Sequence, residues 1–415
     1  MLTGNRVVFV KNARIRLDFT QLRYILYDDV MEVVMILRFG FRNFLSFDEG
    51  VECSFESDSK NKVNTLLNIR GANGSGKTNL LKALAFFMDF VANSFSDLKP
   101  DDSIGVIPFF ESSAPTDFFV EFFVAGFSYI YELSLTKDGV IRESLSRKNK
   151  RYVPVFTRDH DVIKCISEFA ELKKLKCRNN ASIISIAHQN EVDCLKTIYS
   201  IFYLCITNIT TKRSAITLFF DCAEEYGKTT LSKISKIYNE NKKLFEKVKN
   251  FIVESDIGIY DIKLKSEQLV DGSTIFVPSF CHKVGDKTYF LPYSAESRGT
   301  QFLYTNLNFF LFIIDRPHTL LIFDELDMGL HPLLVRKIVS LYSKQDIRNC
   351  GQVIFTAHDT TILDDLKPDK VFLLNKENNE SYGYLVSECS SAIVRKDRNI
   401  RTPYEQGRIG GVPKL

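Results

Sequence analysis

The pattern of apolar and polar residues changes its period around a glycine-rich stretch that begins at residue 71. Residues 64–69, "NTLLNI", form a short apolar run of the kind found in buried strands. Residues 79–95 then repeat their apolar positions every three or four residues, which is typical of an amphipathic helix. The stripe of this helix consists of Leu80, Leu84, Phe87 and Val91, with Leu81 and Met88 at its edge. The pattern therefore predicts a strand, a glycine loop and a helix in direct succession.

Further apolar runs in the second half of the chain end in polar or ionisable groups. Residues 320–323 form an apolar strand that ends in an acidic pair, and the strand predicted from residue 352 ends at a histidine at 358. Upstream of both, residues 294–314 predict a helix that begins with a serine and a glycine. Because strands and helices alternate around the glycine loop, we expect an α/β fold with a mainly parallel central sheet.

The middle of the chain, residues 150–285, predicts a helical insertion. Residues 229–255 are amphipathic, with lysines outward and an inward face of Leu231, Ile234, Ile237, Leu244, Val248 and Phe251. This segment is too short for long coiled-coil arms, so a compact lid or partner-docking lobe is expected. Basic residues gather at 147–158 and 173–180. Such runs are either solvated faces or contacts to nucleic acid phosphates or to an acidic partner.

Composition narrows the class of protein. A chain of 415 residues predicts two or three lobes, and its net charge of +3 is too small to indicate nucleic acid binding by itself. The nine cysteines form no Cys-x-x-Cys pair, which favours reduced thiols over disulfides or zinc. Neither a run of 18 apolar residues nor a signal peptide is found, so we expect a cytoplasmic protein that does not associate with membranes.

The glycine loop matches the pattern G-x-x-x-x-G-K-S/T between its strand and its helix. Backbone N–H groups of such a loop surround an anion, and the helix N-terminus adds positive potential. Lys77 would contact the β- and γ-phosphates of ATP, and the Thr78 hydroxyl would bind Mg²⁺. The nucleotide-binding residues expected from the loop are Gly71, Asn73, Gly74, Ser75, Gly76, Lys77 and Thr78.

The acidic pair at the end of the strand 320–323 predicts hydrolysis rather than simple binding. In a parallel α/β sheet the carboxyl end of a strand lies at the same edge as the phosphate loop. Asp324 would therefore lie in the Mg²⁺ shell together with Thr78. Glu325 would orient and polarise the water that attacks the γ-phosphate, as the catalytic carboxylate.

Two more motifs resemble those of ABC-class P-loop ATPases. A histidine follows a strand in that class and contacts the γ-phosphate, and His358 follows the strand from residue 352. "SRGTQ" (297–301) resembles the signature S-x-G-x-Q that opens a helix, where Ser297 and Gly299 would form a second anion site. The order of the motifs along the chain supports this class more strongly than any one motif.

The chain resembles the ABC/SMC-like ATPases, and more narrowly the prokaryotic abortive-infection AAA ATPases of the Rlo and AbiL type. "MILRFGFRNFLSF", "GANGSGKTNLLKAL", "ESRGTQ", "FDELDMGLHP" and "TAHDTTILD" carry the resemblance. It implies an ABC-type head with an antiparallel β-lobe, which residues 108–145 resemble, and a glycine-rich tail such as "YEQGRIGGVPKL". The match covers roughly residues 35–150 and 285–415.

The chain departs from the ABC pattern at two places. No glutamine occurs between Gln21 and Gln189, so the glutamine that couples Mg²⁺ to the helical lobe is missing, and the segment near Pro108–Phe110 would take its place. After the acidic strand the chain has "MGLH" (328–331) instead of Ser-Ala-Leu-Asp. Both departures concern how nucleotide binding is transmitted to a partner.

The motifs divide the chain into four parts. Residues 1–34 are expected to be an N-terminal extension outside the core, although an ordinary extra strand and helix would also fit. Residues 35–149 would form the first half of the head, with the phosphate loop and β-lobe. Residues 150–285 would form the insertion, and residues 286–415 the second half, with the signature, acidic pair and histidine.

The resemblance implies an ATPase that acts as a sensor or regulator in anti-phage defence. At least two copies would share ATP sites, the phosphate loop of one facing the signature of another. We expect no appended Toprim nuclease, because the chain ends soon after the His358 unit, and hence a separate effector, such as a nuclease. The alternatives are a DNA-repair ATPase of the recombination-mediator type that binds DNA, and a transporter ATPase subunit, which the two departures disfavour.

Overall fold

The computed structural model describes residues 34–58, 62–209, 226–255, 258–269, 272–343, 345, 347–390 and 399–413, with side chains in the helix at 226–240 described from residue 231. These residues belong to one compact unit, Glu32–Leu415. The predicted extension, residues 1–34, lies outside the described residues except for Val34. The prediction about it stays untested.

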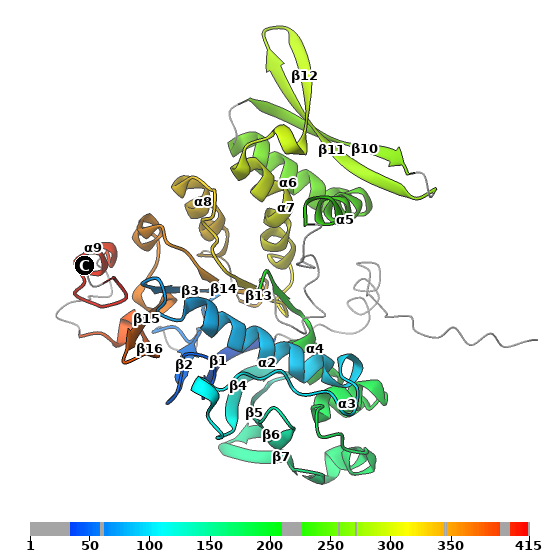
Figure 1. Cartoon of the computed structure of the whole chain (residues 1–415), viewed down its shortest axis with the longest axis vertical. Helices are drawn as coiled ribbons and strands as arrows, with labels where there is room; N and C mark the ends of the chain where they lie inside the picture. Colours follow the sequence, from blue (N-terminus) through cyan, green and yellow to red (C-terminus); the bar gives the residue numbers. More distant parts are fainter. Residues whose placement is uncertain are drawn as a thin grey trace, which may run out of the picture. The chain divides into compact units, whose positions relative to one another are not determined.

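A six-stranded central sheet holds the motifs (Figure 1). Its pairs are parallel except for the last hairpin, β15–β16. Strands β13 and β14 are buried along their whole length, as parallel strands covered on both faces must be. In spatial order the strands are β16 (Glu380–Leu385), β15 (Val371–Glu377), β3 (Leu66–Gly71), β14 (Gln352–Thr356), β13 (Leu320–Phe323) and β9 (Cys205–Thr207).

Helix α2 (Lys77–Asp97) follows β3 through the glycine loop, as predicted. All six apolar residues predicted for its stripe and edge are buried. Part of this face packs against the β-lobe: the rings of Phe87 and Phe118 stack with centroids 5.2 Å apart. Contacts on other parts of α2 reach β3, β9, β13 and β14 of the central sheet. The helix that starts at the glycine loop therefore joins the two sheets.

The β-lobe is a seven-stranded antiparallel sheet. Before its third strand a short 3₁₀ turn, η1 (Phe109–Glu111), occupies the position where the ABC glutamine is missing. The predicted fold class, a mainly parallel α/β sheet with an antiparallel lobe, is confirmed. In spatial order the strands are β2 (Val51–Ser54), β1 (Met35–Arg42), β4 (Thr116–Val124), β5 (Phe127–Leu135), β6 (Val140–Asn149), β7 (Arg151–Asp159) and β8 (Val162–Cys165).

The insertion predicted to be helical is a mixture of helices and strands. Strands β7 and β8 continue the β-lobe past residue 149, β9 pairs with β13 of the central sheet, and β10 (Ile259–Gln268) and β11 (Thr274–Val284) form a hairpin. The prediction followed the one clear helical period and missed strands whose alternation is interrupted by charges. The other elements of the segment are η2 (Ser167–Lys174), α3 (Ile183–Gln189), η3 (Asp193–Leu195), α4 (Lys196–Tyr203), α5 (Tyr226–Glu240) and α6 (Lys242–Ser255).

The amphipathic segment 229–255 is two helices rather than one. Helix α5 ends before Asn241, and the Asn241 side chain accepts a hydrogen bond from Leu244 N at 3.0 Å and so caps α6. The inward residues predicted for the segment are buried, apart from the half-buried Leu231. Strand β12 (Lys287–Pro292) completes a three-stranded sheet with β10 and β11, and this sheet contacts α5 and α6 (Figure 1).

The second half of the head begins with η4 (Tyr293–Ala295) and α7 (Arg298–Ile313), which packs along α6. Helix α8 (Pro332–Ser343) follows β13, and a 3₁₀ turn, η5 (Thr360–Asp364), follows β14. The tail folds back: α9 (Arg401–Glu405) contacts η5. The remaining short turns are η6 (Pro368–Lys370) and η7 (Val386–Glu388).

Candidate nucleotide-binding site

The glycine loop has the shape that phosphate binding requires. Gly74 and Gly76 have φ angles of 77° and 106°, a region that side chains disfavour. A Cβ at Gly76 would lie 2.6 Å from Ser381 Oγ, whereas one at Gly74 would meet nothing within 4 Å. The loop therefore needs glycine at both positions for its backbone, and it is open on the Gly74 side.

Two side chains of the loop are suited to an anion. Ser75 Oγ is buried without a hydrogen-bond partner, and buried polar atoms of that kind call for one. Lys77 Nζ donates to the carbonyl oxygens of Gly71 and Ala72 at 2.8 and 3.1 Å. Burial lowers the pKa of Lys77, while the carboxylates of Asp324 and Glu325 oppose that shift. A phosphate group would satisfy both side chains.

The loop is held at the junction of the two sheets. Ser46, which follows β1 of the β-lobe, accepts a hydrogen bond from Asn79 Nδ2 of α2 at 2.9 Å. The Ser381 hydroxyl of β16 lies 2.9 Å from Ser46 Oγ, and both hydroxyls face Gly76. Two segments from distant parts of the sequence, the turn after β1 and β16, therefore fix the N-terminus of α2.

The predicted Mg²⁺ ligands lie side by side. The Thr78 hydroxyl donates to Asp324 Oδ2 at 2.8 Å, so α2 and β13 bring a hydroxyl and a carboxylate together. Mg²⁺ is bound by oxygen atoms, with few protein ligands and the remainder from phosphates and water. No cluster of three or more His, Cys, Asp or Glu ligands occurs in the part of the chain that the structure describes.

Thr356, which the sequence analysis missed, connects this acidic pair to β14. Its hydroxyl donates to Asp324 Oδ1 at 2.5 Å and accepts from Glu325 N at 2.7 Å. Asn208, also missed, holds the backbone of Asp324 from the other side, with two hydrogen bonds of 2.8 and 2.9 Å. Both residues follow or end strands that neighbour β13, and their position at strand ends was the only signal in the sequence.

Glu325 has an exposed side chain on a strained backbone. Its φ angle is 54°, a left-handed value that is uncommon for a residue other than glycine. Strain of this kind persists where surrounding bonds enforce it, and it is concentrated at functional sites. Here the hydrogen bond from Glu325 N to Thr356 is one such constraint. The backbone thus turns the Glu325 carboxylate toward solvent, directly after Asp324, the predicted Mg²⁺ ligand.

The loop that contains His358 is fixed through its backbone. Asp327 Oδ2 accepts hydrogen bonds from His358 N and Asp359 N, both at 2.7 Å, which ties the loop to the segment after β13. On the other side, the buried guanidinium of Arg70 donates to the carbonyl oxygens of His358 and Asp359. The His358 side chain itself is exposed. Asp327 and Arg70 are further residues that the sequence analysis missed.

The signature residues are placed at a helix N-terminus, as predicted. Ser297 caps α7 by accepting a hydrogen bond from Thr300 N at 3.1 Å, and its side chain is exposed. A Cβ at Gly299 would lie 3.0 Å from the carbonyl oxygen of Gly329 in the same chain. Within the described residues, no hydrogen bond joins Ser297 or Gly299 to the glycine loop. The structure of one chain therefore does not bring the two predicted phosphate sites together.

The segment that replaces the ABC glutamine presents aromatic side chains. Phe110 is 72% exposed and has a φ angle of 37°, and its ring packs edge-on against Phe109. Asn43 anchors the segment by accepting from Phe109 N and donating to Ala114 O. No amide side chain takes over the missing glutamine within this turn.

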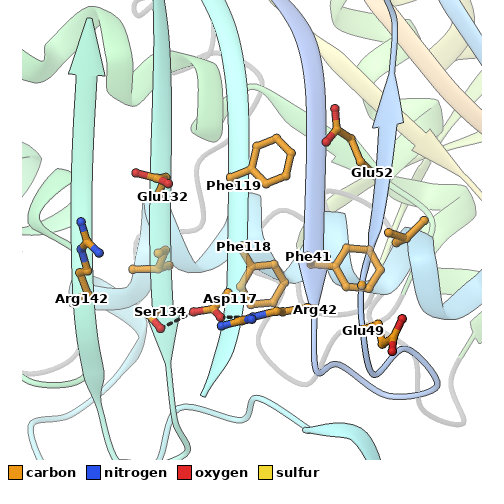
Figure 2. Close-up of a pocket in the computed structure, with 13 residues that line it drawn as sticks. Phe41, Arg42, Glu49, Glu52, Asp117, Phe118, Phe119, Glu132, Ser134 and Arg142 are labelled. Atoms are coloured by element: carbon orange, nitrogen blue, oxygen red, sulfur yellow. Dashed lines mark hydrogen bonds and ion pairs between the residues drawn. The ribbon is translucent and has the colours of Figure 1, made fainter. Parts of the chain in front are cut away.

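A hollow of about 710 Å³ lies over the β-lobe rather than at the glycine loop (Figure 2). Within it, Asp117 pairs with Arg42 and accepts a hydrogen bond from Ser134. Glu49, Glu52 and Glu132 also line the hollow. Because their carboxylates would repel phosphates, the hollow is a poor phosphate site. The nucleotide site is therefore assigned to the loop and not to this hollow.

A glycine loop between strand β3 and helix α2, with a carboxylate at the end of β13 on its Thr hydroxyl, defines a P-loop nucleoside triphosphatase fold and site. A family model described as "AAA domain, putative AbiEii toxin, Type IV TA system" matches residues 69–364. The chain belongs to that family. The narrower resemblance to the Rlo and AbiL type stays a prediction.

Among solved structures, the chain is similar to SMC head domains. The chain is similar to an SMC head bound to the C-winged helix domain of ScpA, with 18% identity, a TM-score of 0.47, and coverage of 84% of this chain and 96% of that one. The SMC head domain from Thermotoga maritima has 14% identity, a TM-score of 0.41, and coverage of 84% and 98%. An SMC head domain with an extended coiled coil, bound to the C-terminal domain of ScpA and derived from Pyrococcus furiosus, is 16% identical with a TM-score of 0.45. The match covers 85% of this chain and 96% of that one. No curated protein matches the chain.

The structure bears on two features of the composition, the apolar helices and the cysteines. None of the described helices combines the length and apolar character needed to cross a membrane. The eight cysteines in the described residues are all unpaired, and four of them are buried. Burial raises the pKa of the Cys205 and Cys350 thiols, which favours the protonated form. Cys222 lies outside the described residues.

Proposed function

We propose that this protein is a Mg²⁺-dependent ATPase whose catalytic carboxylate is Glu325. The observation that carries the proposal is the chain of contacts from Thr78 through Asp324 to Thr356, which ends at the backbone of Glu325. Mg²⁺ held by Thr78 and Asp324 would neutralise developing charge on the phosphates. Lys77 and the loop amides would bind the β- and γ-phosphates, and Glu325 would orient the attacking water.

The remaining predicted residues act on the same reaction. Exposed and fixed through its backbone, His358 is available to contact the γ-phosphate. Ser297 and Gly299, at the N-terminus of α7, would complete the site of a second copy, because helix N-termini favour anions. The exposure of Ser297 supports this arrangement. We therefore propose a homo-oligomer, at least a dimer, that closes on ATP and reopens after hydrolysis.

We place the activity in the cytoplasm, in a prokaryotic anti-phage system with a separate effector. The support is the family description, which names a putative AbiEii toxin and a Type IV TA system. The exposed Phe110 turn, where ABC enzymes transmit nucleotide binding, provides a surface on which such an effector could dock. A test is phage plating on cells that carry the wild-type locus or Glu325→Gln; equal protection from both would contradict a role for hydrolysis.

Calorimetry with a non-hydrolysable ATP analogue tests the binding step. Lys77→Ala should weaken binding at least about 30-fold, since removing one member of a buried charge pair costs 2 kcal/mol or more. Lys82→Ala, five residues further along α2, is the matched control and should leave affinity unchanged. Equal affinities for Lys77→Ala and wild type would refute the assignment of the loop.

Phosphate release tests the catalytic step. Glu325→Gln should bind ATP but hydrolyse it about 100-fold more slowly or worse, which is the scale of general-base help. Glu171→Gln, an exposed glutamate of the β-lobe turn η2, should retain full turnover. If Glu325→Gln turns over like the wild type, another group is the catalytic carboxylate.

A further inference from the structure

The three-stranded sheet β10–β11–β12 presents lysines and aromatic rings on one face. Antiparallel partners share a face, and Asp261, Cys281 and Phe290 are such partners. Residues two positions away along each strand lie on that face too. They include Lys263 and Lys265 on β10 and Lys283 on β11. Tyr260 joins them at a bulge, because its hydroxyl donates to Thr288 Oγ1 at 3.1 Å.

The lysines of this face lie over its rings. Lys263 Nζ and Lys265 Nζ are 5.7 and 5.3 Å from the centroid of the Phe290 ring. Lys283 Nζ is 5.2 Å from the centroid of the Tyr260 ring. These distances are near the outer limit of a cation–π contact, so the ammonium groups can be displaced at small cost. Both rings remain accessible, with Tyr260 40% and Phe290 48% exposed.

The three lysines of the face are not held in ion pairs by the described residues. Lys263, Lys265 and Lys283 are exposed and take part in no ion pair within the described part of the chain. Two carboxylates share the face: Asp261 lies 3.5 Å from Lys249 Nζ of α6 and accepts a hydrogen bond from Ile262 N, and Glu267 lies two residues beyond Lys265 near the end of β10. The opposite face is the one that packs inward, with Ile259, Ile262 and Phe280 buried. On the lysine face, Cys281 and Ser279 of the central strand β11 are buried, whereas its lysines and rings are exposed.

We propose that this face, formed by Tyr260, Lys263, Lys265, Lys283 and Phe290, binds single-stranded nucleic acid. Aromatic rings on which bases stack, combined with cations that follow the phosphates, are what sequence-tolerant single-strand binding requires. A duplex would offer phosphates but no free base faces, and an acidic peptide would use the lysines but not the rings. The proposal does not depend on the ATPase site.

Fluorescence anisotropy with a labelled oligothymidylate tests the proposal. Changing Lys263, Lys265 and Lys283 together to Gln should weaken binding and reduce the salt slope of log K by about 2, since each phosphate contact on a single strand contributes about 0.7. The matched control changes Lys173, Lys174 and Lys176 to Gln, a basic run of the same charge on η2 and the turn after it. It should retain affinity and slope.

Phe290→Leu tests stacking separately from charge. It keeps an apolar side chain but removes the ring, and should weaken binding about 5- to 150-fold, the range for one stacked base. Phe290→Tyr, which keeps an aromatic ring, should bind the oligothymidylate with wild-type affinity. Circular dichroism of each variant shows whether the sheet has stayed folded. Repeating the titration in Lys77→Ala separates this site from ATP binding, and affinity should be unchanged.

Three results would overturn the proposal. One is equal affinity of the triple Gln variant and the wild type. Another is loss of binding in the η2 control but not in the sheet variant. The third is a duplex of the same length, or an acidic peptide, that binds as tightly as the single strand, together with no loss of single-strand affinity in Phe290→Leu.

Discussion

Thr356 shows how a single hydroxyl can organise the site. It ends β14, one strand away from the glycine loop, yet it contacts both members of the acidic pair. It donates to the Asp324 carboxylate and accepts from the backbone of Glu325, so it uses its donor and one acceptor position. A valine has the same shape but neither bond.

We expect Thr356→Val to reduce ATP turnover about 10- to 150-fold, which corresponds to the 1.5–3 kcal/mol of a hydrogen bond to a charged group. Affinity for ATP should change far less, because the loop and Lys77 are untouched. Steady-state phosphate release and analogue titration measure the two effects. Thr65→Val is the control: it removes another buried hydroxyl, bonded to Tyr342 O, with no contact to the acidic pair. If both variants lose turnover equally, general destabilisation is the cause.

At the scale of elements, the sequence predicted the helices and strands whose apolar pattern is not interrupted. Strand β13 has the predicted bounds, and α2 differs by two residues at each end, because unbroken apolar runs and a helical period are strong signals. The helix break at Asn241 was missed because the apolar stripe continues on both sides of it. Strands β7, β8, β10 and β11 were missed because lysines, arginines and prolines interrupt their alternation.

The sequence predicted a residue of the candidate site only where that residue belongs to a local sequence motif. Lys77, Thr78 and Asp324 belong to local patterns, and the structure brings them together. Asn208 and Arg70 act through hydrogen bonds to segments more than 100 residues away, which no local pattern encodes. The joining of the signature to a phosphate loop is a property of an assembly, so neither the sequence nor one chain tests it.

The N-terminus of α7 allows a charge test that leaves the helix intact. Serine, aspartate and asparagine are comparable caps, so Ser297→Asp and Ser297→Asn should both keep α7 folded. Only Ser297→Asp places a negative charge where the triphosphate of a second copy is proposed to lie. It should reduce turnover at least about tenfold, because like charges at an interface cost several kcal/mol. Ser297→Asn should stay near wild type.

Gly299 is less suitable for this test. A side chain there would press on the carbonyl oxygen of Gly329 within the same chain, so a loss of activity would have a local explanation. Phosphate release for the two Ser297 variants is therefore the measurement. Equal turnover in Ser297→Asp and Ser297→Asn would mean that this helix end does not face a nucleotide.

At the scale of the whole molecule, mixing two inactive variants tests shared sites. Lys77→Ala lacks the phosphate loop function and Ser297→Asp lacks the signature function. In a mixed dimer one site would combine an intact loop with an intact signature, whereas neither homodimer has such a site. We expect ATPase activity to reappear on mixing, up to about a quarter of wild type if subunits exchange at random, one intact site of two in half of the dimers.

The control is each variant alone at the same total concentration, which should stay well below the rate of the mixture. Co-purification of the two variants through a tag that only one of them carries shows whether mixed assemblies form. A wild-type rate per chain that does not change with dilution, down to concentrations where only monomers sediment, would exclude sharing.

The junction formed by Ser46, Asn79 and Ser381 has a consequence for how the protein melts. These side chains belong to the β-lobe, α2 and the central sheet, and they meet at the first turn of α2. Since one helix is the common support of both sheets, neither sheet can lose its structure without exposing the apolar face of α2. Calorimetry of the wild type should therefore give one endotherm for the two sheets, displaced upward as a unit by ATP. Ser381→Val, which breaks the contact and crowds Gly76, should lower the midpoint of this endotherm without splitting it, because α2 still packs against both sheets.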